Sequence, residues 1–182
     1  MAAPLPFIYL GSALAFASVA AVHDVRERRI PNRLSGLGIL VGLLLHLLLA
    51  GVLQFVWALL AGLLAGAIFF LFYLAGGMGA GDVKLMAAIG CLTGIALIKD
   101  VLLATVLIGA VCALLLALAR GRLRETVQNV FVLIAHHQAA GLAAHPELNV
   151  TNQRLLRLPY AVPIAIGCMA VLGFEIVQGS SL

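Results

Sequence analysis

The chain has 182 residues, of which 64% are apolar and only 10% are charged. Soluble domains carry roughly 25% charged residues, so this composition excludes a water-soluble globule. The apolar residues form continuous runs rather than alternating with polar ones, which argues against a transmembrane β-barrel. The sequence therefore predicts an all-α polytopic membrane protein, in which each helix satisfies its own backbone hydrogen bonds in lipid.

A helical span needs about 20 predominantly apolar residues, and six runs of the chain approach that length. We predict spans at approximately 5–22, 34–50, 55–75, 83–98, 101–119 and 160–178. Lys99 and Asp100 mark the expected turn between the fourth and fifth spans. No internal repeat or soluble extension divides the sequence, so residues 1–182 are expected to form one membrane domain whose longest connection is 120–158.

The basic residues indicate how these spans are oriented. Ten of the eleven fall in connections that a six-span chain places on one side: Arg26, Arg28, Arg29, Arg33, Lys84, Arg120, Arg122, Arg124, Arg154 and Arg157. Only Lys99 falls on the other side. Because basic residues concentrate in cytoplasmic connections, both chain termini are expected outside (N-out, C-out). The same distribution explains the net charge of +4 without a nucleic-acid partner.

The third predicted span has small residues at four-residue spacing, with Gly62 and Gly66 beside Ala61 and Ala65. This pattern lets two helices approach closely. Packing within the chain is favoured over dimerisation, and the sequence leaves the oligomeric state open.

Two aspartates, Asp24 and Asp82, lie where an apolar run gives way to basic residues. An ionisable side chain at membrane depth is costly and is a candidate for function, and two carboxylates at one depth indicate acid–base chemistry. Taken alone, Asp24 is better explained as an interfacial carboxylate paired with Arg26 or Arg28, a pairing that contributes little to stability.

Asp82 ends a glycine-rich turn that runs from Gly76 to Gly81. A structural role is available here too, since an aspartate can cap the following helix. The glycines exceed what a cap requires, and their tolerance of close backbone approach suits an extended peptide lying across the turn. A phosphate cradle is the competing use, but the GxxxxGK[ST] pattern is missing.

Other polar segments give weaker signals. Leu123, Val127, Phe131 and Ile134 recur at helical spacing, which predicts either a helix in the membrane interface or a connector packed on its own bundle. His136, His137 and His145 lack a carboxylate or cysteine at matching spacing, so no metal site is expected. Cys91, Cys112 and Cys168 fall inside predicted spans and favour buried packing over disulfides.

These motifs together resemble a known family. Asp24 with Arg26 and Ile30-Pro31-Asn32, then Gly79-Ala80-Gly81-Asp82 with Lys84, and finally Leu158-Pro159-Tyr160, are similar to the type IV prepilin peptidases, which are GxGD aspartyl proteases of bacterial membranes. The compact layout looks most like the tight-adherence (Flp pilus) branch. Many members carry glycine where this chain has Ala161, so a local backbone bend is in doubt there.

The resemblance implies a multi-pass protein of the bacterial inner membrane that removes the basic leader of a prepilin at the cytoplasmic face. It implies Asp24 and Asp82 as the catalytic pair, with Gly79, Gly81, Lys84 and Arg26 toward the substrate. Neither a metal nor another cofactor is expected, and the partners are the prepilin and membrane lipid.

Two functions from other classes compete with this reading. A small proton-coupled transporter could use the two aspartates as a relay, although transporter sites usually lie near the bilayer midplane between repeated halves. A non-catalytic membrane scaffold would explain the spans but would leave the glycine-rich turn without a role.

Overall fold

A computed structural model of the protein describes residues 5–149 and 158–180, and within these residues all regular structure is helical. The helices, in chain order, are α1 (Leu5–Glu27), α2 (Asn32–Ala50), α3 (Val52–Leu74), α4 (Ala80–Ala119), α5 (Leu123–Ala140) and α6 (Ala161–Ser180). In the described part of the chain, five of them, all except α5, are long and apolar enough to cross a membrane. The predicted all-α polytopic fold is confirmed.

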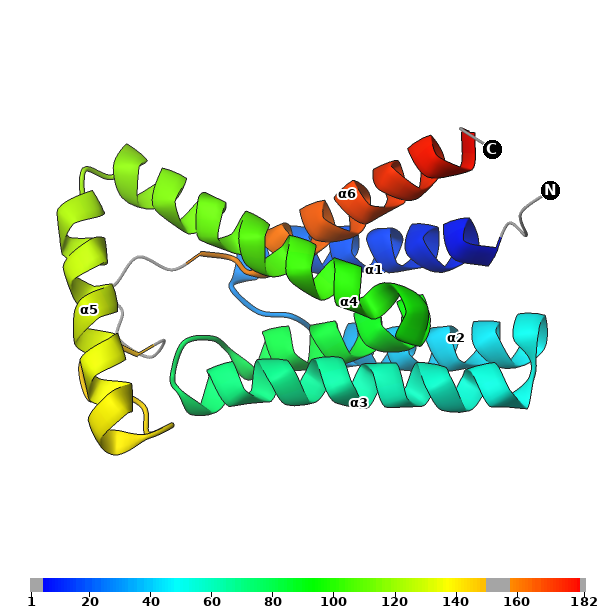
Figure 1. Cartoon of the computed structure of the whole chain (residues 1–182), viewed down its shortest axis with the longest axis horizontal. Coiled ribbons are helices and arrows are strands. Elements are labelled where there is room, and N and C mark those ends of the chain that lie inside the picture. Colours follow the sequence, from blue (N-terminus) through cyan, green and yellow to red (C-terminus); the bar gives the residue numbers. More distant parts are fainter. Residues whose placement is uncertain (1–4, 150–157, 181–182) are drawn as a thin grey trace.

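The fourth and fifth predicted spans are the two arms of α4, which breaks at Gly94. A straight helix of 40 residues would be about 60 Å long, yet Asp82 and Ala117, near its opposite ends, line one cavity. Helix α4 is therefore a hairpin, and Figure 1 shows its second arm returning toward the end where the first arm begins. The predicted turn at Lys99 and Asp100 is wrong, because both residues lie inside the second arm.

Gly94 is the point at which this reversal is possible. Its φ of 72° lies in the region that glycine enters at little cost. The ring of His46, on α2, fills the space where a side chain at position 94 would lie, with its Cε1 atom 2.7 Å from an ideal Cβ position. His46 also stacks on Tyr9 of α1, with ring centroids 3.9 Å apart. Irregular backbone at membrane depth is tolerated where protein buries it, and Gly94 is buried.

The first arm of α4 packs against α2 and α3 through glycines. An ideal Cβ at Gly42 would lie 2.6 Å from the backbone of Cys91, and one at Gly90 would lie 2.6 Å from the carbonyl oxygen of Ala61. Gly62 and Gly66 of α3 likewise face Ala87 of α4. The small residues of the third predicted span therefore serve packing within the chain, as expected.

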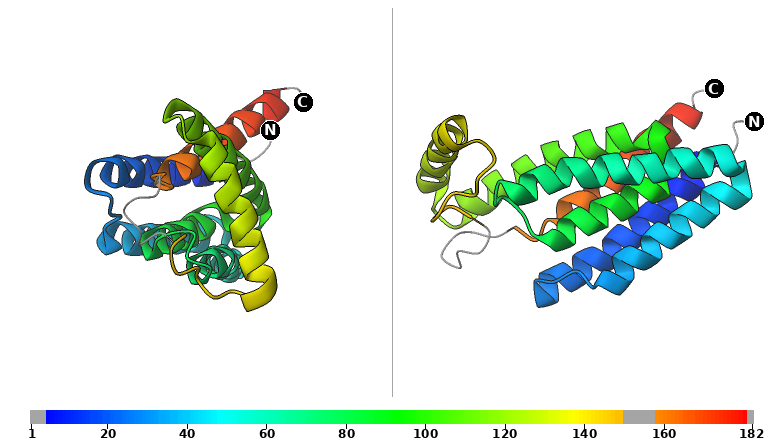
Figure 2. Two further views of the ribbon diagram at one scale, coloured as in Figure 1. Left: turned by 90° about the vertical axis from the view of Figure 1, so that its left-hand side faces the viewer. Right: turned by 90° about the horizontal axis from the view of Figure 1, so that it is seen from below.

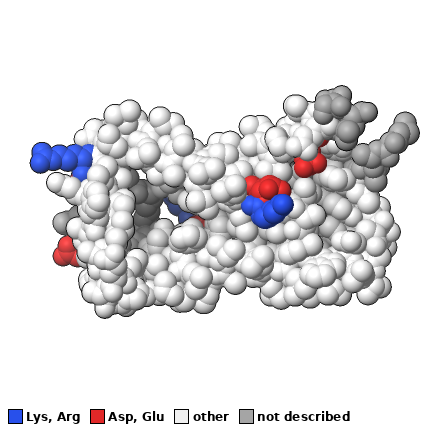
Figure 3. Space-filling view, viewed as in Figure 1, with Lys and Arg blue, Asp and Glu red and all other residues white. Residues whose placement is uncertain are grey.

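The helix ends gather at two ends of the molecule. Figure 1 places the first residues of α1 and the last residues of α6 at one end, and the start of α4 and all of α5 at the other. Helix α5 lies across that second end, roughly perpendicular to the bundle, in both views of Figure 2. Figure 3 shows that the face seen there carries few charged side chains, as a lipid-facing surface requires.

The connection 120–158 contains the predicted amphipathic helix, which is α5. No residue of α5 is buried, and the side chain of Phe131 is 68% exposed. Arg154 and Arg157, which contribute to the predicted orientation, lie outside the described residues.

Candidate active site

Asp24 lies in the last turn of α1 and is buried, with only 8% of its surface exposed. Its Oδ2 atom accepts a hydrogen bond from the backbone N–H of Ala161, the first residue of α6, at 3.3 Å. Arg28 lies close enough to interact with the carboxylate electrostatically, whereas Arg26 is exposed. Of the two arginines expected to pair with Asp24, Arg28 thus interacts with it, and the amide of a distant helix also binds the carboxylate.

Asp82 is the third residue of α4, and Gly79 is the residue that caps the helix. The Gly79 N–H donates to Asp82 Oδ2 at 3.1 Å, which is the side-chain half of a capping box. The prediction that Asp82 is the N-cap residue is wrong, because Gly79, three positions earlier, caps the helix. Because only one carboxylate oxygen is used in this bond, and the residue is half-buried, the other oxygen remains available to a substrate.

The connection between α1 and α2 is tied to the start of α4 by two contacts. The side chain of Ile30 covers Gly81, where an ideal Cβ would lie 3.3 Å from Ile30 Cβ. Lys84 Nζ donates to Asn32 Oδ1 at 2.9 Å. The two sequence motifs that carry the family resemblance are therefore in direct contact, although about 50 residues separate them along the chain.

These contacts bring the two aspartates to the same end of the bundle. Asp24 and Asp82 lie close enough for their charges to interact. The amide of Ala161 binds Asp24, and Tyr160, the preceding residue, interacts electrostatically with Asp82. The start of α6 thus joins the ends of α1 and α4 at one site.

Tyr160 belongs to this site, although its sequence motif gave no indication of its position. Its ring packs edge-on against Phe69 of α3, with centroids 5.9 Å apart, and its hydroxyl approaches Gly109 on the second arm of α4. A Cβ at Gly109 would lie 2.7 Å from that hydroxyl oxygen. The Tyr160 side chain therefore occupies space that any side chain at position 109 would fill.

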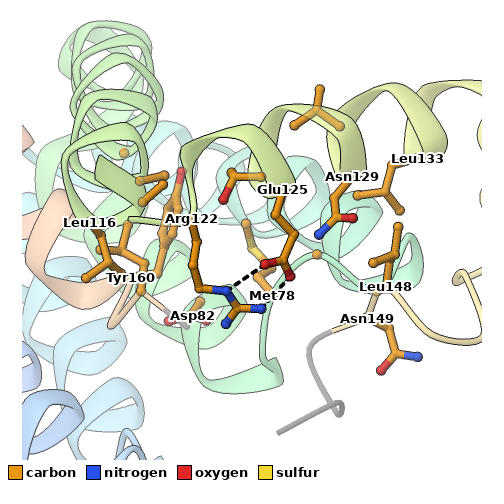
Figure 4. A pocket seen from close by; sticks show the side chains of 18 residues that line it. Met78, Asp82, Leu116, Arg122, Glu125, Asn129, Leu133, Leu148, Asn149 and Tyr160 are labelled. Atoms are coloured by element: carbon orange, nitrogen blue, oxygen red, sulfur yellow. Dashed lines mark hydrogen bonds and ion pairs between the residues drawn. The ribbon is translucent and has the colours of Figure 1, made fainter. Parts of the chain in front are cut away.

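A cavity of about 350 Å³ opens on Asp82. Figure 4 shows its lining side chains, which come from α4, α5, the glycine-rich turn and the segment before α6. The lining changes character along the cavity. The second arm of α4 contributes Gly109, Ala113, Leu116 and Ala117, whereas α5 contributes three polar residues (Glu125, Thr126 and Asn129) and two apolar ones (Val130 and Leu133). Asp24 does not line it.

An ion pair also lines the cavity, and the sequence analysis did not single it out. Arg122 Nε donates to Glu125 Oε2 at 2.7 Å, and Arg122 Nη2 contacts Glu125 Oε1. This hydrogen bonding lowers the pKa of Glu125, so its carboxylate is ionised at neutral pH. The i, i+3 spacing of the two residues could have indicated a pair, but not that it faces a cavity.

The histidines take no part in the site around the two aspartates. His23 pairs with Glu27 at 3.7 Å. His136 lies beside both His137 and His145, with ring centroids 5.4 and 4.8 Å away. Within residues 5–149 and 158–180, no group of three or more histidine, cysteine, aspartate or glutamate side chains is arranged to hold a metal ion.

Comparison with known families gives one match. The model of the type IV leader peptidase family matches residues 12–117, which include both aspartates, the glycine-rich turn and Lys84 but not α5 or Tyr160. Neither the curated proteins nor the solved structures give a match. Because the family model covers more than half of the sequence, the chain belongs to the type IV leader peptidase family, whose members are peptidases.

Proposed function

We propose that this protein is a membrane aspartyl endopeptidase that removes the basic leader of a type IV prepilin of the Flp kind. Family membership supports a leader peptidase. The observation that carries the choice of residues is that Asp24 and Asp82 lie at one end of the bundle, close enough for their charges to interact, with a cavity opening on Asp82.

The chemistry follows from two carboxylates that repel each other when both are ionised and therefore tend to share one proton. The ionised carboxylate takes a proton from water as the water oxygen bonds to the scissile carbonyl carbon. The protonated partner donates its proton to the carbonyl oxygen. The C–N bond then breaks as the leaving nitrogen takes the proton of the protonated carboxylic acid. At the same time the ionised partner takes a hydroxyl proton from the tetrahedral intermediate, which re-forms the carbonyl of the product and returns one shared proton to the pair. Either aspartate can begin in either role, so the activity should follow a bell-shaped pH dependence that belongs to the pair.

The glycine-rich turn provides the surface along which the substrate backbone lies. Gly79 carries no side chain that would hold an extended peptide away from Asp82, since an ideal Cβ there would lie 3.4 Å from Asp82 Oδ2. Gly81 lets Ile30 pack against the turn and so supports its shape from behind. Lys84 holds the turn against Asn32 and keeps its ammonium group at the site. Arg26 is exposed two residues after the buried Asp24, and we assign it to the polar part of the substrate.

Cleavage takes place at the cytoplasmic face of the bacterial inner membrane in this proposal. The basic residues near Asp24 and Asp82 support that side under the positive-inside rule. Cysteine-labelling reporters at Arg29, Gly79 and His145 should be accessible from the cytoplasm, and one at Gln54 from outside. Reversed accessibility at any of these positions would contradict the orientation.

The protein cleaves leaders without methylating the new amino terminus in this proposal. Bifunctional relatives carry a cytoplasmic methyltransferase insertion with paired CxxC motifs, by the resemblance described above. Here α1 ends at Glu27 and α2 begins at Asn32, and the three cysteines form no such pair.

The experiment is cleavage of an Flp-type prepilin peptide by the purified protein in detergent, in the presence of S-adenosylmethionine. Mass spectrometry should detect the free leader and an unmethylated mature amino terminus. A methylated product would contradict the single activity. Absence of cleavage, combined with proton-coupled uptake in proteoliposomes, would instead support the transporter.

A further inference from the structure

The cavity beside Asp82 is lined by small and apolar residues along the second arm of α4, whereas α5 contributes the polar Glu125, Thr126 and Asn129 together with the apolar Val130 and Leu133. The proposed substrate carries a basic leader, and the polar side chains of α5 are the lining residues that suit a basic segment. This comparison rests on the proposed function. It orients the substrate, because the leader belongs at the α5 end of the cavity.

Glu125 is the only acidic residue besides Asp82 among the residues that line this cavity in the described part of the chain. Figure 4 shows Glu125 and Asn129 extending from α5 toward the cavity, with Arg122 between Glu125 and Asp82. The Glu125 side chain is 47% exposed, so a ligand can reach it without any movement of the backbone.

Arg122 holds the Glu125 carboxylate in place but leaves that carboxylate able to accept further hydrogen bonds. The guanidinium contacts each carboxylate oxygen once, and a carboxylate accepts about four hydrogen bonds. Each oxygen thus keeps a free lone pair. A second cation can bind Glu125 while Arg122 stays in place, because the carboxylate then lies between two positive charges.

We propose that Glu125, held in place by Arg122, recognises a lysine or arginine side chain of the substrate leader. Glu125 determines specificity by direct contact, whereas Arg122 is a positioning residue. The cation lies along α5 while the scissile bond lies at Asp82, so the contact sets which peptide bond reaches the aspartates.

The test compares two prepilin peptides that differ only in the leader, with lysine in one and glutamine in the other at the same positions. Wild-type protein should cleave the lysine peptide about three- to tenfold more efficiently in kcat/KM, the range expected for a half-exposed charge-assisted contact. Glu125→Gln should remove this preference by lowering kcat/KM for the lysine peptide alone. Glu125→Asp, which keeps the charge, should retain most of it.

Glu147→Gln is the matched control. Glu147 is an exposed carboxylate in the same connection, 120–158, as Glu125, but it does not line the cavity. It should keep the wild-type preference. Thermal unfolding of each variant in detergent checks that it is folded.

Three outcomes would overturn the inference. The first is a wild-type protein that does not discriminate between the peptides. The second is a Glu125→Gln variant that keeps the preference or loses activity equally on both peptides. In either case cleavage that depends on Asp24 and Asp82 would leave the proposed function standing. The third is a wild-type protein that cleaves neither peptide, which would overturn the proposed function as well.

Discussion

The two ends of the helical bundle differ in how they are held together. At the end where α4 reverses, Gly94 packs against His46, and His46 stacks on Tyr9. At the other end, Asp24 and Asp82 are held by single hydrogen bonds from backbone amides, beside a cavity of about 350 Å³. The first end is closely packed around the break in α4, whereas the second is open and holds the two aspartates.

This difference predicts that residues at the packed end determine the stability of the protein, whereas residues at the open end determine its activity. Close packing of backbones makes a core sensitive to one added methyl group. At the aspartates, by contrast, an isosteric amide can still accept the backbone hydrogen bond that each carboxylate receives. We therefore expect substitutions at the aspartates to abolish activity without unfolding the protein. Substitutions at the packed glycines should unfold it.

The largest effect is expected at the aspartates. Asp24→Asn and Asp82→Asn should each lower kcat/KM for prepilin cleavage by about a thousandfold or more, because an amide supplies neither the negative charge nor the shared proton. Asparagine Oδ1 can still accept the bonds from Ala161 and Gly79. The unfolding midpoint in detergent should consequently stay close to that of wild type. Substantial residual cleavage in either variant would move the catalytic pair elsewhere.

The packed region is tested by two glycines of α2. Gly42→Ala places a methyl group 2.6 Å from the backbone of Cys91 and should cost about 3 kcal/mol in the free energy of unfolding. Gly36→Ala is the matched control, since an added Cβ there meets nothing within 4 Å. It should be neutral or stabilising by up to about 1 kcal/mol, because alanine favours helix. Equal costs, measured by unfolding in mixed micelles, would contradict the close helix contact.

The reversal of α4 is tested by two glycines with positive φ. Gly94→Ala combines an unfavourable φ of 72° with a contact to the His46 ring, and should cost about 2 kcal/mol. Gly51→Ala, at a φ of 84° with no neighbour within 4 Å, carries the backbone strain alone. The excess loss at Gly94 should fall when His46 is replaced by alanine. Persistence of the full excess in that background would show that His46 does not set the break.

The smallest effect is expected at Lys84. Lys84→Met removes the exposed hydrogen bond to Asn32, and exposed interactions of this kind contribute about 0–1 kcal/mol. Unfolding should therefore change little, while KM for the peptide rises if the ammonium group also meets the substrate. Lys99→Met, on the second arm of α4 outside the cavity, is the control for loss of a positive charge. An identical change in KM for both variants would remove Lys84 from the site.

The helices could be predicted from the sequence because they depend on local composition, whereas the catalytic role of the two aspartates is a proposal that rests on the family resemblance. Apolar runs give the helices directly, and charges at the ends of such runs identify Asp24 and Asp82. The position of the α4 break could not be predicted in this way. Lys99 and Asp100 mark a polar interruption, but the chain turns at Gly94, where a glycine conformation and the ring of His46 coincide.

Contacts between segments that are distant in the chain could not be predicted from a sequence pattern either. The hydrogen bond from Ala161 to Asp24 joins residues 137 positions apart. The neighbouring motif Leu158-Pro159-Tyr160 supports the family resemblance but does not indicate which residue Ala161 contacts. The cavity contact of Glu125 depends on where α5 crosses the end of the bundle, which composition does not specify.

The most direct test of a shared catalytic pair is the double variant Asp24→Asn/Asp82→Asn, assayed beside both single variants on one prepilin peptide. If the carboxylates act as one unit, the double variant should have a kcat/KM within about threefold of the weaker single variant, because losses within one catalytic unit are not additive. A double variant weaker by the product of the two single losses would contradict the shared pair and would assign the aspartates to independent roles.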